Sequence, residues 1–147
     1  KYELDKESGA IMVDRFVQTA MFYPCNYGFI PNTLSGDGDP VDVLVLSNYP
    51  IIPSAIVKCR PIGVLMMEDE SGLDEKIIAV PISKVDISFD NIRNITDVAG
   101  IMKNRIKHFF EHYKDLNKDK WVKVLEWGDI EEAKKLIEEG IKRNSSN

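Results

Sequence analysis

The chain centres on Gly36-Asp37-Gly38-Asp39-Pro40-Val41-Asp42, a run that leads directly into the apolar segment Val43-Leu44-Val45-Leu46. Gly36 and Gly38 permit positive φ, so the backbone can fold tightly and aim neighbouring side chains inward. Pro40 fixes its own φ and pushes Asp39 toward an extended conformation. Asp42 then opens a predicted strand, which gives its carboxylate a rigid position.

Three carboxylates, those of Asp37, Asp39 and Asp42, fall within this run and repel one another when ionised. At about 4–5 Å and an effective dielectric near 20, each pair costs roughly 3–4 kcal/mol. Splaying into water and holding a cation both relieve this repulsion. A helix–loop–helix calcium site does not fit, because Asp42 stands where that loop needs Gly and Asn48 where it needs Glu. Hard oxygen ligands favour Mg²⁺, Mn²⁺ or Ca²⁺ over softer metals.

Length and composition predict one ordinary globular domain. The chain has 147 residues, of which 44% are hydrophobic and 29% charged. Its formal net charge of -5 argues against a nucleic-acid surface as its main function. The sequence contains no apolar run of membrane-spanning length and no signal-peptide pattern, so we expect a cytoplasmic protein without membrane contact. Cys25 and Cys59 lie in apolar company and are predicted to be buried thiols rather than a disulfide.

Short strands dominate the first part of the chain, and one more precedes the last helix. The predicted strands cover residues 1–5, 10–17, 41–46, 55–59, 62–67, 77–80 and 121–127. A turn at Ser71-Gly72 would set Asp69 opposite Asp74, and the period of two places Asp74 and Lys76 on the same face.

Two helices are predicted in the second half, which gives an α+β class. The first covers residues 97–113 with Asp97 as its N-cap. Its apolar stripe consists of Val98, Ile101, Met102, Ile106, Phe109, Phe110 and Tyr113. The second begins after Asp129, which caps it together with Glu132. Its predicted inward side chains are Ile130, Ala133, Leu136, Ile137 and Ile141.

The run His108-Phe109-Phe110-Glu111-His112 matches the H-x-x-E-H pattern of one class of zinc peptidases. The sequence offers no obvious third ligand, and both histidines lie at the edge of the apolar stripe. We therefore favour a helix surface used in subunit contact, where protonation of His108 and His112 matters.

Carboxylates and cations recur in separated places along the chain. The carboxylates are Asp37, Asp39, Asp42, Asp69 and Asp74, and the cations are Lys1, Arg15, Lys76 and Lys114. A site that joins hard metal ions to fixed positive side chains suits a polyanion with many phosphoryl oxygens.

With these residues in view, the chain resembles the soluble family I inorganic pyrophosphatases, most of all their short bacterial type. The similar blocks follow one another over nearly the whole chain. They are Lys1 to Gly9, Tyr23-Pro24-Cys25-Asn26-Tyr27-Gly28, the acidic signature Asp37 to Val43, Asp69 to Lys76, His108 to Lys114, and Lys120-Trp121-Val122-Lys123-Val124.

The resemblance implies a mainly β, α+β fold: an OB-like closed five-stranded β-barrel flanked by two main helices, as one domain over residues 1–147. It implies hydrolysis of pyrophosphate to two phosphates by a metal-activated water, which would drive biosynthesis that releases pyrophosphate. Several Mg²⁺ ions per site are implied, with Mn²⁺ or Zn²⁺ as substitutes. The implied assembly is a homohexamer with the 97–114 helix at a subunit contact.

Site roles follow from the same resemblance, position by position. The metal ligands would be Asp37, Asp42, Asp69 and Asp74, and Asp39 would orient and deprotonate the attacking water. The substrate-binding side chains would be Lys1, Arg15, Tyr27, Lys76, Tyr113 and Lys114, supported by Glu3 and Tyr23. The family carries a segment before the position of Lys1, including a Glu that contacts a metal through water. We expect that segment to be absent here.

Two other functions remain open on the sequence. An OB-type module could bind single-stranded nucleic acid through aromatic stacking and a basic groove, but here the candidate groove is acidic. A metal-dependent hydrolase could instead act on nucleotides or other phosphate esters. Phosphate release from pyrophosphate, ATP and a phosphomonoester, with and without Mg²⁺, distinguishes these functions.

Overall fold

The structure is a computed structural model and describes residues 1–146. Its strands are β1 (Tyr2–Leu4), β2 (Ile11–Val13), β3 (Asn26–Phe29), β4 (Asp42–Val45), β5 (Cys59–Asp69), β6 (Gly72–Leu73), β7 (Lys76–Pro81) and β8 (Val122–Gly128). Its helices are α1 (Gly100–His112) and α2 (Ile130–Ser145), with short 3₁₀ turns η1 (Ile87–Phe89) and η2 (Ile95–Asp97). This mainly β chain with two helices confirms the predicted α+β class.

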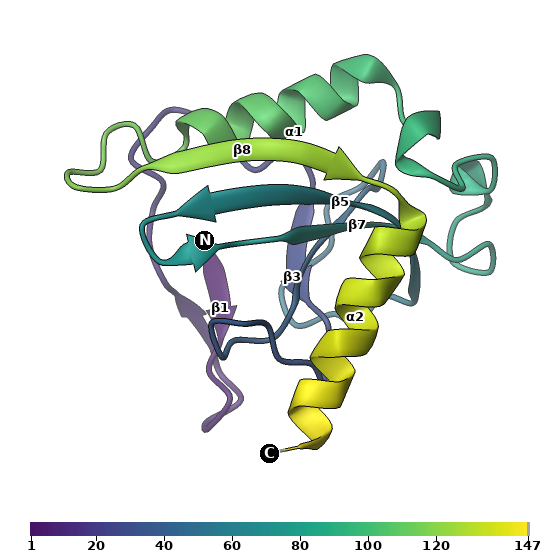
Figure 1. Ribbon diagram of the computed structural model, residues 1–147, viewed down its shortest axis with the longest axis horizontal. Helices are drawn as coiled ribbons and strands as arrows, with labels where there is room; N and C mark the ends of the chain where they lie inside the picture. Colours follow the sequence, from purple (N-terminus) through teal and green to yellow (C-terminus); the bar gives the residue numbers. More distant parts are fainter. Residues whose placement is uncertain (147) are drawn as a thin grey trace.

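One main sheet positions the rest of the chain (Figure 1). Its strand order is β3-β4-β7-β5-β6, and β8 pairs with β5, while β1 and β2 form a separate hairpin. The pairing of β4 with β7 is parallel, and the other pairings are antiparallel. Within residues 1–146 these pairings do not join the edges of the sheet, so the closed five-stranded barrel is not confirmed.

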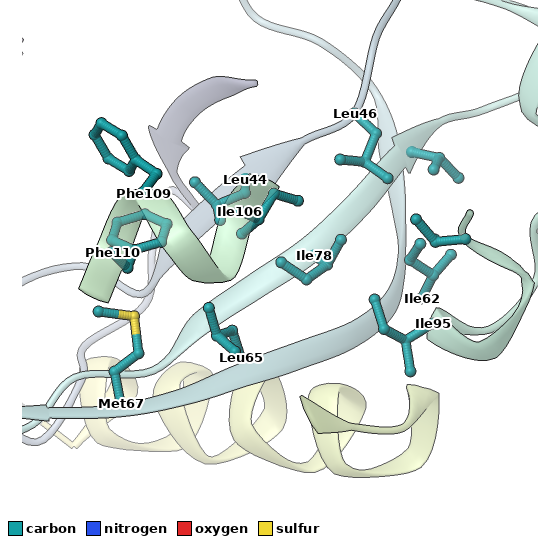
Figure 2. Close-up of a cluster of buried hydrophobic side chains, with 12 residues drawn as sticks. Leu44, Leu46, Ile62, Leu65, Met67, Ile78, Ile95, Ile106, Phe109 and Phe110 are labelled. Carbon is teal, nitrogen blue, oxygen red and sulfur yellow. The ribbon is translucent and has the colours of Figure 1, made fainter. Parts of the chain in front are cut away.

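The main sheet separates two hydrophobic cores. On β4, Leu44 shares one core with Ile106 and Phe110 of α1 (Figure 2), whereas Val43 shares the other with Ala133 of α2. Successive side chains of a strand point to opposite faces, so the apolar run of β4 serves both cores. The continuous apolar segment after Asp42 is therefore a central strand covered by a helix on each face.

The two strands predicted at 55–59 and 62–67 are wrong as separate elements, because β5 runs without interruption through both Pro61 and Gly63. Residues 55–58 lie outside it. Pairing with β7 shifts register between Pro61 and Gly63. A strand tolerates proline at such an irregularity, where the missing N–H removes no regular ladder bond.

The hairpin turn between β5 and β6 also differs from the prediction. Asp69 pairs with Gly72, so the turn residues are Glu70 and Ser71 rather than Ser71 and Gly72. The backbone N–H of Asp74 donates to the carbonyl of Met67 at 2.9 Å. Asp74 therefore lies opposite Met67, and the predicted direct opposition of Asp69 and Asp74 is wrong.

The first helix begins at Gly100, later than predicted, and its N-cap Ala99 makes no side-chain cap. The carboxylate of Asp97 instead closes a capping box with Asn94 around η2. The predicted role of Asp97 as N-cap of the first helix is therefore wrong: Asn94 is the N-cap of η2, and Asp97 is the last residue of that turn. Ile101 is 62% exposed, so the predicted apolar stripe of α1 is narrower at its start.

The second helix begins as predicted. The Oδ1 of Asp129 accepts from the backbone N–H groups of Glu131 and Glu132, and Oε2 of Glu132 accepts from the N–H of Asp129 at 3.0 Å. Ala133 is fully buried, but Ile141 is exposed, contrary to the prediction. In this last part of α2, the buried residue on the inward face of the helix is Gly140 rather than Ile141.

Both cysteines are free thiols, as predicted, but both are half-buried rather than buried. Burial raises the pKa of the Cys25 thiol to about 12. No helix within residues 1–146 is long and apolar enough to span a bilayer.

Candidate active site

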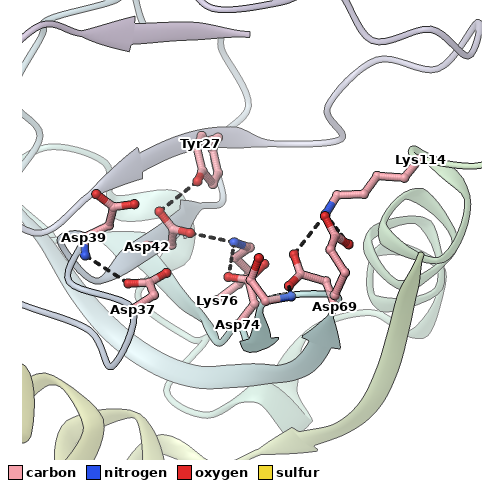
Figure 3. Close-up of polar contacts among 10 residues, drawn as sticks. Tyr27, Asp37, Asp39, Asp42, Asp69, Asp74, Lys76 and Lys114 are labelled. Atoms are coloured by element: carbon pink, nitrogen blue, oxygen red, sulfur yellow. Dashed lines mark hydrogen bonds and ion pairs between the residues drawn. The ribbon is translucent and has the colours of Figure 1, made fainter. Parts of the chain in front are cut away.

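The site centres on the ammonium of Lys76, a residue that is 4% exposed. Its Nζ lies 2.5 Å from Oδ2 of Asp42 and 2.5 Å from Oδ1 of Asp74 (Figure 3). Parallel pairing sets Val43 opposite Ile77, which brings Asp42 beside Lys76. Asp74 shares the face of Lys76, as the period of two predicted. Burial lowers the pKa of Lys76, but the two carboxylates outweigh burial and raise it overall, so the ammonium stays charged.

Tyr27 on β3 covers the carboxylate of Asp42. Its hydroxyl donates to Oδ1 of Asp42 at 2.7 Å. Antiparallel pairing sets Asp42 opposite Phe29, so Asp42 and Tyr27 share a face of the sheet. Burial, and then the charge of Asp42, raise the pKa of Tyr27 and keep its hydroxyl protonated. The Nζ atoms of Lys1 and Lys76 lie 5.9 and 5.7 Å from the ring centroid, within the range of cation–π attraction.

A second ion pair joins the end of β5 to the segment after α1. The Nζ of Lys114 lies 2.9 Å from Oδ2 of Asp69, and both side chains are 14% exposed. Glu70 lies 3.7 Å from the same Nζ and 2.5 Å from Nζ of Lys120. The hydrogen bond from Lys120 lowers the pKa of Glu70 to about 2. Sequence reasoning missed Glu70 and Lys120 as site neighbours, because they are 50 positions apart and belong to no common motif.

Tyr23 and Tyr113 form an aromatic wall beside these cations. The ring of Tyr23 lies 5.4 Å from that of Tyr27 and 4.6 Å from that of Phe109, on which Tyr113 also stacks at 5.2 Å. Burial raises the pKa of both Tyr23 and Tyr113 to about 12, so both hydroxyls can donate at neutral pH.

Asp14 holds two of the predicted substrate-binding cations. Its Oδ2 lies 2.7 Å from Nε of Arg15 and 3.6 Å from Nζ of Lys1. The hydrogen bond from Arg15 keeps the pKa of Asp14 below its usual range. Sequence reasoning missed Asp14, although its position next to Arg15 was an available signal. Glu3 is exposed on β1, and within residues 1–146 no hydrogen bond or ion pair joins it to another predicted site residue.

The acidic loop, defined here as residues 34–41, carries Asp37 and Asp39 toward the same edge of the sheet (Figure 3). The N–H of Asp39 donates to Oδ1 of Asp37 at 2.9 Å. Gly38 takes positive φ (89°) as predicted, whereas Gly36 does not. Both aspartates are exposed, and in the described chain the carboxylate of Asp39 has no ion-pair or hydrogen-bond partner.

The four predicted metal ligands lie in three different settings. Asp42 and Asp74 share Lys76, Asp69 pairs with Lys114, and Asp37 bonds within the acidic loop. Across residues 1–146, no three carboxylate, imidazole or thiol side chains lie close enough together to hold a metal ion. Burial raises the pKa of Asp74 against the lowering effect of Lys76, and the charges of Asp42 and Asp69 add to the rise. This edge therefore concentrates negative charge.

Fixed cations and hard carboxylate oxygens alternate at one edge of this α+β sheet, the arrangement expected of a protein that binds phosphorylated anions. The family model described as inorganic pyrophosphatase matches residues 1–145. The inorganic pyrophosphatase of Rickettsia typhi is 69% identical over 144 residues, covering 98% of this chain and 81% of that protein. That of Xanthomonas axonopodis pv. citri is 56% identical over 147 residues, covering 100% and 83%.

A solved structure gives the same result. The inorganic pyrophosphatase from Helicobacter pylori matches with a TM-score of 0.97 at 54% identity, covering 99% of this chain and 85% of that one. The chain belongs to the inorganic pyrophosphatase family and is therefore a hydrolase.

Replacing Lys76 with methionine (Lys76→Met) removes the ammonium that Asp42 and Asp74 share. We expect the pKa of Asp74 to rise further in this variant, because in the native chain Lys76 opposes the effect of burial. The free energy of unfolding at pH 7 should fall by about 3 kcal/mol. A carboxyl group whose pKa is higher in the folded protein than its ordinary 3.8 stabilises the fold while it is protonated, and that contribution is lost as the pH rises through the folded-state pKa. The difference in unfolding free energy between Lys76→Met and the native chain should therefore grow from about pH 4 upward. Carboxyl ¹³C NMR titration and urea unfolding between pH 4 and 7 measure both effects.

Lys120→Met is the matched control, because it removes an exposed lysine whose partner is Glu70. It should leave the titration of Asp74 unchanged. An unchanged pKa of Asp74 in Lys76→Met would contradict the pairing.

Proposed function

We propose that this site hydrolyses inorganic pyrophosphate to two phosphates by direct attack of water, with Asp39 as the proton acceptor. The observation that carries the proposal is the position of Lys76 between Asp42 and Asp74, with Lys114 on Asp69 nearby. Cations and hard anionic oxygens alternate there, which suits a polyanion that arrives together with divalent ions.

In the proposed reaction, the water oxygen attacks one phosphorus atom and the bridging P–O bond breaks. The electron pair of that bond leaves with the second phosphate, and the proton of the water passes to Asp39. The carboxylate of Asp39 suits this role because it is exposed and unpaired within residues 1–146. No covalent intermediate is required.

Cationic and hydroxyl side chains would neutralise charge on the phosphoryl oxygens. They are Lys1, Arg15, Lys76, Lys114, Tyr27 and Tyr113. The pKa of Lys76 is raised, so its ammonium stays charged throughout the physiological pH range. The hydroxyl of Tyr113 has a pKa of about 12 and remains a donor. Tyr23 and Glu3 would support these phosphate-binding side chains.

The donor atoms suit a hard divalent ion by their chemistry, whereas no three of the carboxylates converge within residues 1–146. Asp37, Asp42, Asp69 and Asp74 offer carboxylate oxygens only, the ligands that Mg²⁺ and Mn²⁺ prefer. The raised pKa of Asp74 reflects burial and like charge, which a divalent ion would relieve. We propose Mg²⁺ at these residues, with Mn²⁺ or Zn²⁺ as substitutes. When bound, the ion would lower the pKa of water and offset phosphoryl charge.

We propose that the chain assembles into a homohexamer with the 97–114 helix at a subunit contact. We also propose that the enzyme is located in the cytoplasm. There the enzyme would remove pyrophosphate released by biosynthesis. Support for the contact comes from the outer face of α1, where the rings of His108 and His112 lie 4.5 Å apart and Nδ1 of His112 lies 2.8 Å from Asp115. A groove of about 450 Å³ beside them is lined in part by Ile101 and by Phe22, which is 89% exposed.

The two aspartate roles can be separated by substitution. Asp42→Asn should raise the Mg²⁺ concentration for half-maximal activity about tenfold or more, because it removes a charged ligand. Asp39→Asn should lower kcat about 10²- to 10⁴-fold with a nearly unchanged Mg²⁺ requirement, because it removes only the proton acceptor. Phosphate release from pyrophosphate across a Mg²⁺ titration measures both.

Asp86→Asn is the control, because Asp86 caps η1 and bonds to Ser88 rather than to a site residue. ATP and a phosphomonoester serve as competing substrates. If Asp39→Asn and Asp42→Asn behave alike, the division of roles is wrong. Release from ATP or the phosphomonoester as fast as from pyrophosphate would favour a general phosphate-ester hydrolase.

The proposed subunit contact predicts a pH-dependent assembly. The rings of His108 and His112 lie 4.5 Å apart on that face, so positive charge on both would be repulsive and should weaken a contact made there. Light scattering from pH 8 to pH 5 should show the mass falling in the native chain. His108→Gln and His112→Gln should reduce the fall. An identical mass at every pH in all three proteins would exclude this role.

A further inference from the structure

The acidic loop contacts α2 at both of its ends. At the first end, the N–H of Leu34 donates to the carbonyl of Gly140 at 3.0 Å, and the guanidinium of Arg143 donates to the carbonyl of Leu34 at 3.2 Å. At the other end, Cγ2 of Val41 lies 2.8 Å from the position that a Cβ on Gly140 would occupy. Oγ1 of Thr33 links the two ends by accepting from the N–H of Val41 at 3.0 Å. Both ends therefore depend on the last turns of α2 (Figure 1).

Between its ends, the acidic loop bonds mainly to itself. The N–H of Ser35 donates to the carbonyl of Asp39 at 2.7 Å. Beside the loop is a cavity of about 200 Å³, lined in part by Ser35, Gly36, Leu136 and Arg143. The loop therefore keeps its own shape as a unit, while its position relative to the sheet is set at the ends.

We propose that Gly140 and Arg143 are positioning residues that hold Asp37 and Asp39 in place beside Asp42. Asp42 is already fixed by β4. A displaced loop would therefore change the distances from Asp42 to Asp37 and Asp39 without unfolding the sheet. Neither Gly140 nor Arg143 takes part in the ion pairs of Lys76 or Lys114. This inference rests on the proposed function, because it uses the roles assigned there to Asp37 and Asp39.

Arg143→Met tests the inference, because it removes the donor to Leu34 but keeps an apolar stem. We expect amide hydrogen exchange in residues 34–41 to quicken about tenfold. The Mg²⁺ concentration for half-maximal activity should rise about fivefold with little change in kcat. Arg143→Lys, which keeps a donor, should restore part of both effects.

Glu139→Gln is the matched control. Glu139 pairs with Nη2 of Arg143 at 3.5 Å, so this variant removes that ion pair and leaves the hydrogen bond to Leu34 in place. Exchange in residues 34–41 should remain native. As a second variant, Gly140→Ala forces a Cβ against Val41 and should affect the loop in the same direction as Arg143→Met.

Native exchange in residues 34–41 of Arg143→Met would overturn the proposal. Exchange that quickens equally in α2 and the main sheet, with a lower urea midpoint, would also overturn it, because the effect would then be general destabilisation. Fast exchange confined to residues 34–41 with native activity and Mg²⁺ requirement would confirm the anchor but contradict the catalytic use of the loop. That failure belongs to the proposed function, which Asp39→Asn tests separately.

Discussion

The buried ammonium of Lys76 is the constraint on which the site depends. Removing a charge from water costs several kcal/mol, so β7 can begin with lysine only where carboxylates lie beside it. The parallel register of β4 and β7 supplies Asp42, and the short connection into β7 supplies Asp74. A register slip of one residue would turn Asp42 to the other face and leave the ammonium with half of its compensation. The same register buries Leu44 and Val43 in their separate cores, so core packing and site geometry require one arrangement of these strands.

The two helices support different parts of the site through that sheet. The core under α1 includes the rings of Tyr23 and Tyr113, and the chain leaving α1 delivers Lys114 to Asp69. The core under α2 includes Val41, the last residue of the acidic loop, which packs closely against Gly140 of α2. Under the proposed function, Tyr113 and Lys114 therefore depend on the α1 side, and the loop that carries the proton acceptor depends on the α2 side.

Sequence patterns succeeded where neighbours in sequence are also neighbours in space. The capping box of Asp129 and Glu132 and the shared face of Asp74 and Lys76 are both short-range relations. The patterns failed where a competing or distant partner decides the outcome. Asp97 bonds back to Asn94, the N-cap of η2, instead of capping α1, and the proline in β5 is tolerated because a register shift accommodates it. The acidic loop was predicted from its own residues, but its anchor on α2 is more than 100 positions away and has no local signal.

The charge balance at the sheet edge constrains how ligands can bind. One ammonium, that of Lys76, faces two carboxylates, and Asp37 and Asp39 add negative charge without an ion-pair partner in the described chain. Burial raises the pKa of Asp74, Lys76 opposes this rise, and the charges of Asp42 and Asp69 add to it. A polyanion entering this edge alone would meet net repulsion, and divalent ions entering alone would still compete with Lys76 for the same oxygens. Ions that occupy those oxygens would free Lys76 to face phosphoryl oxygens. Under the proposed function, metal and pyrophosphate therefore strengthen each other's binding, and neither binds as well by itself.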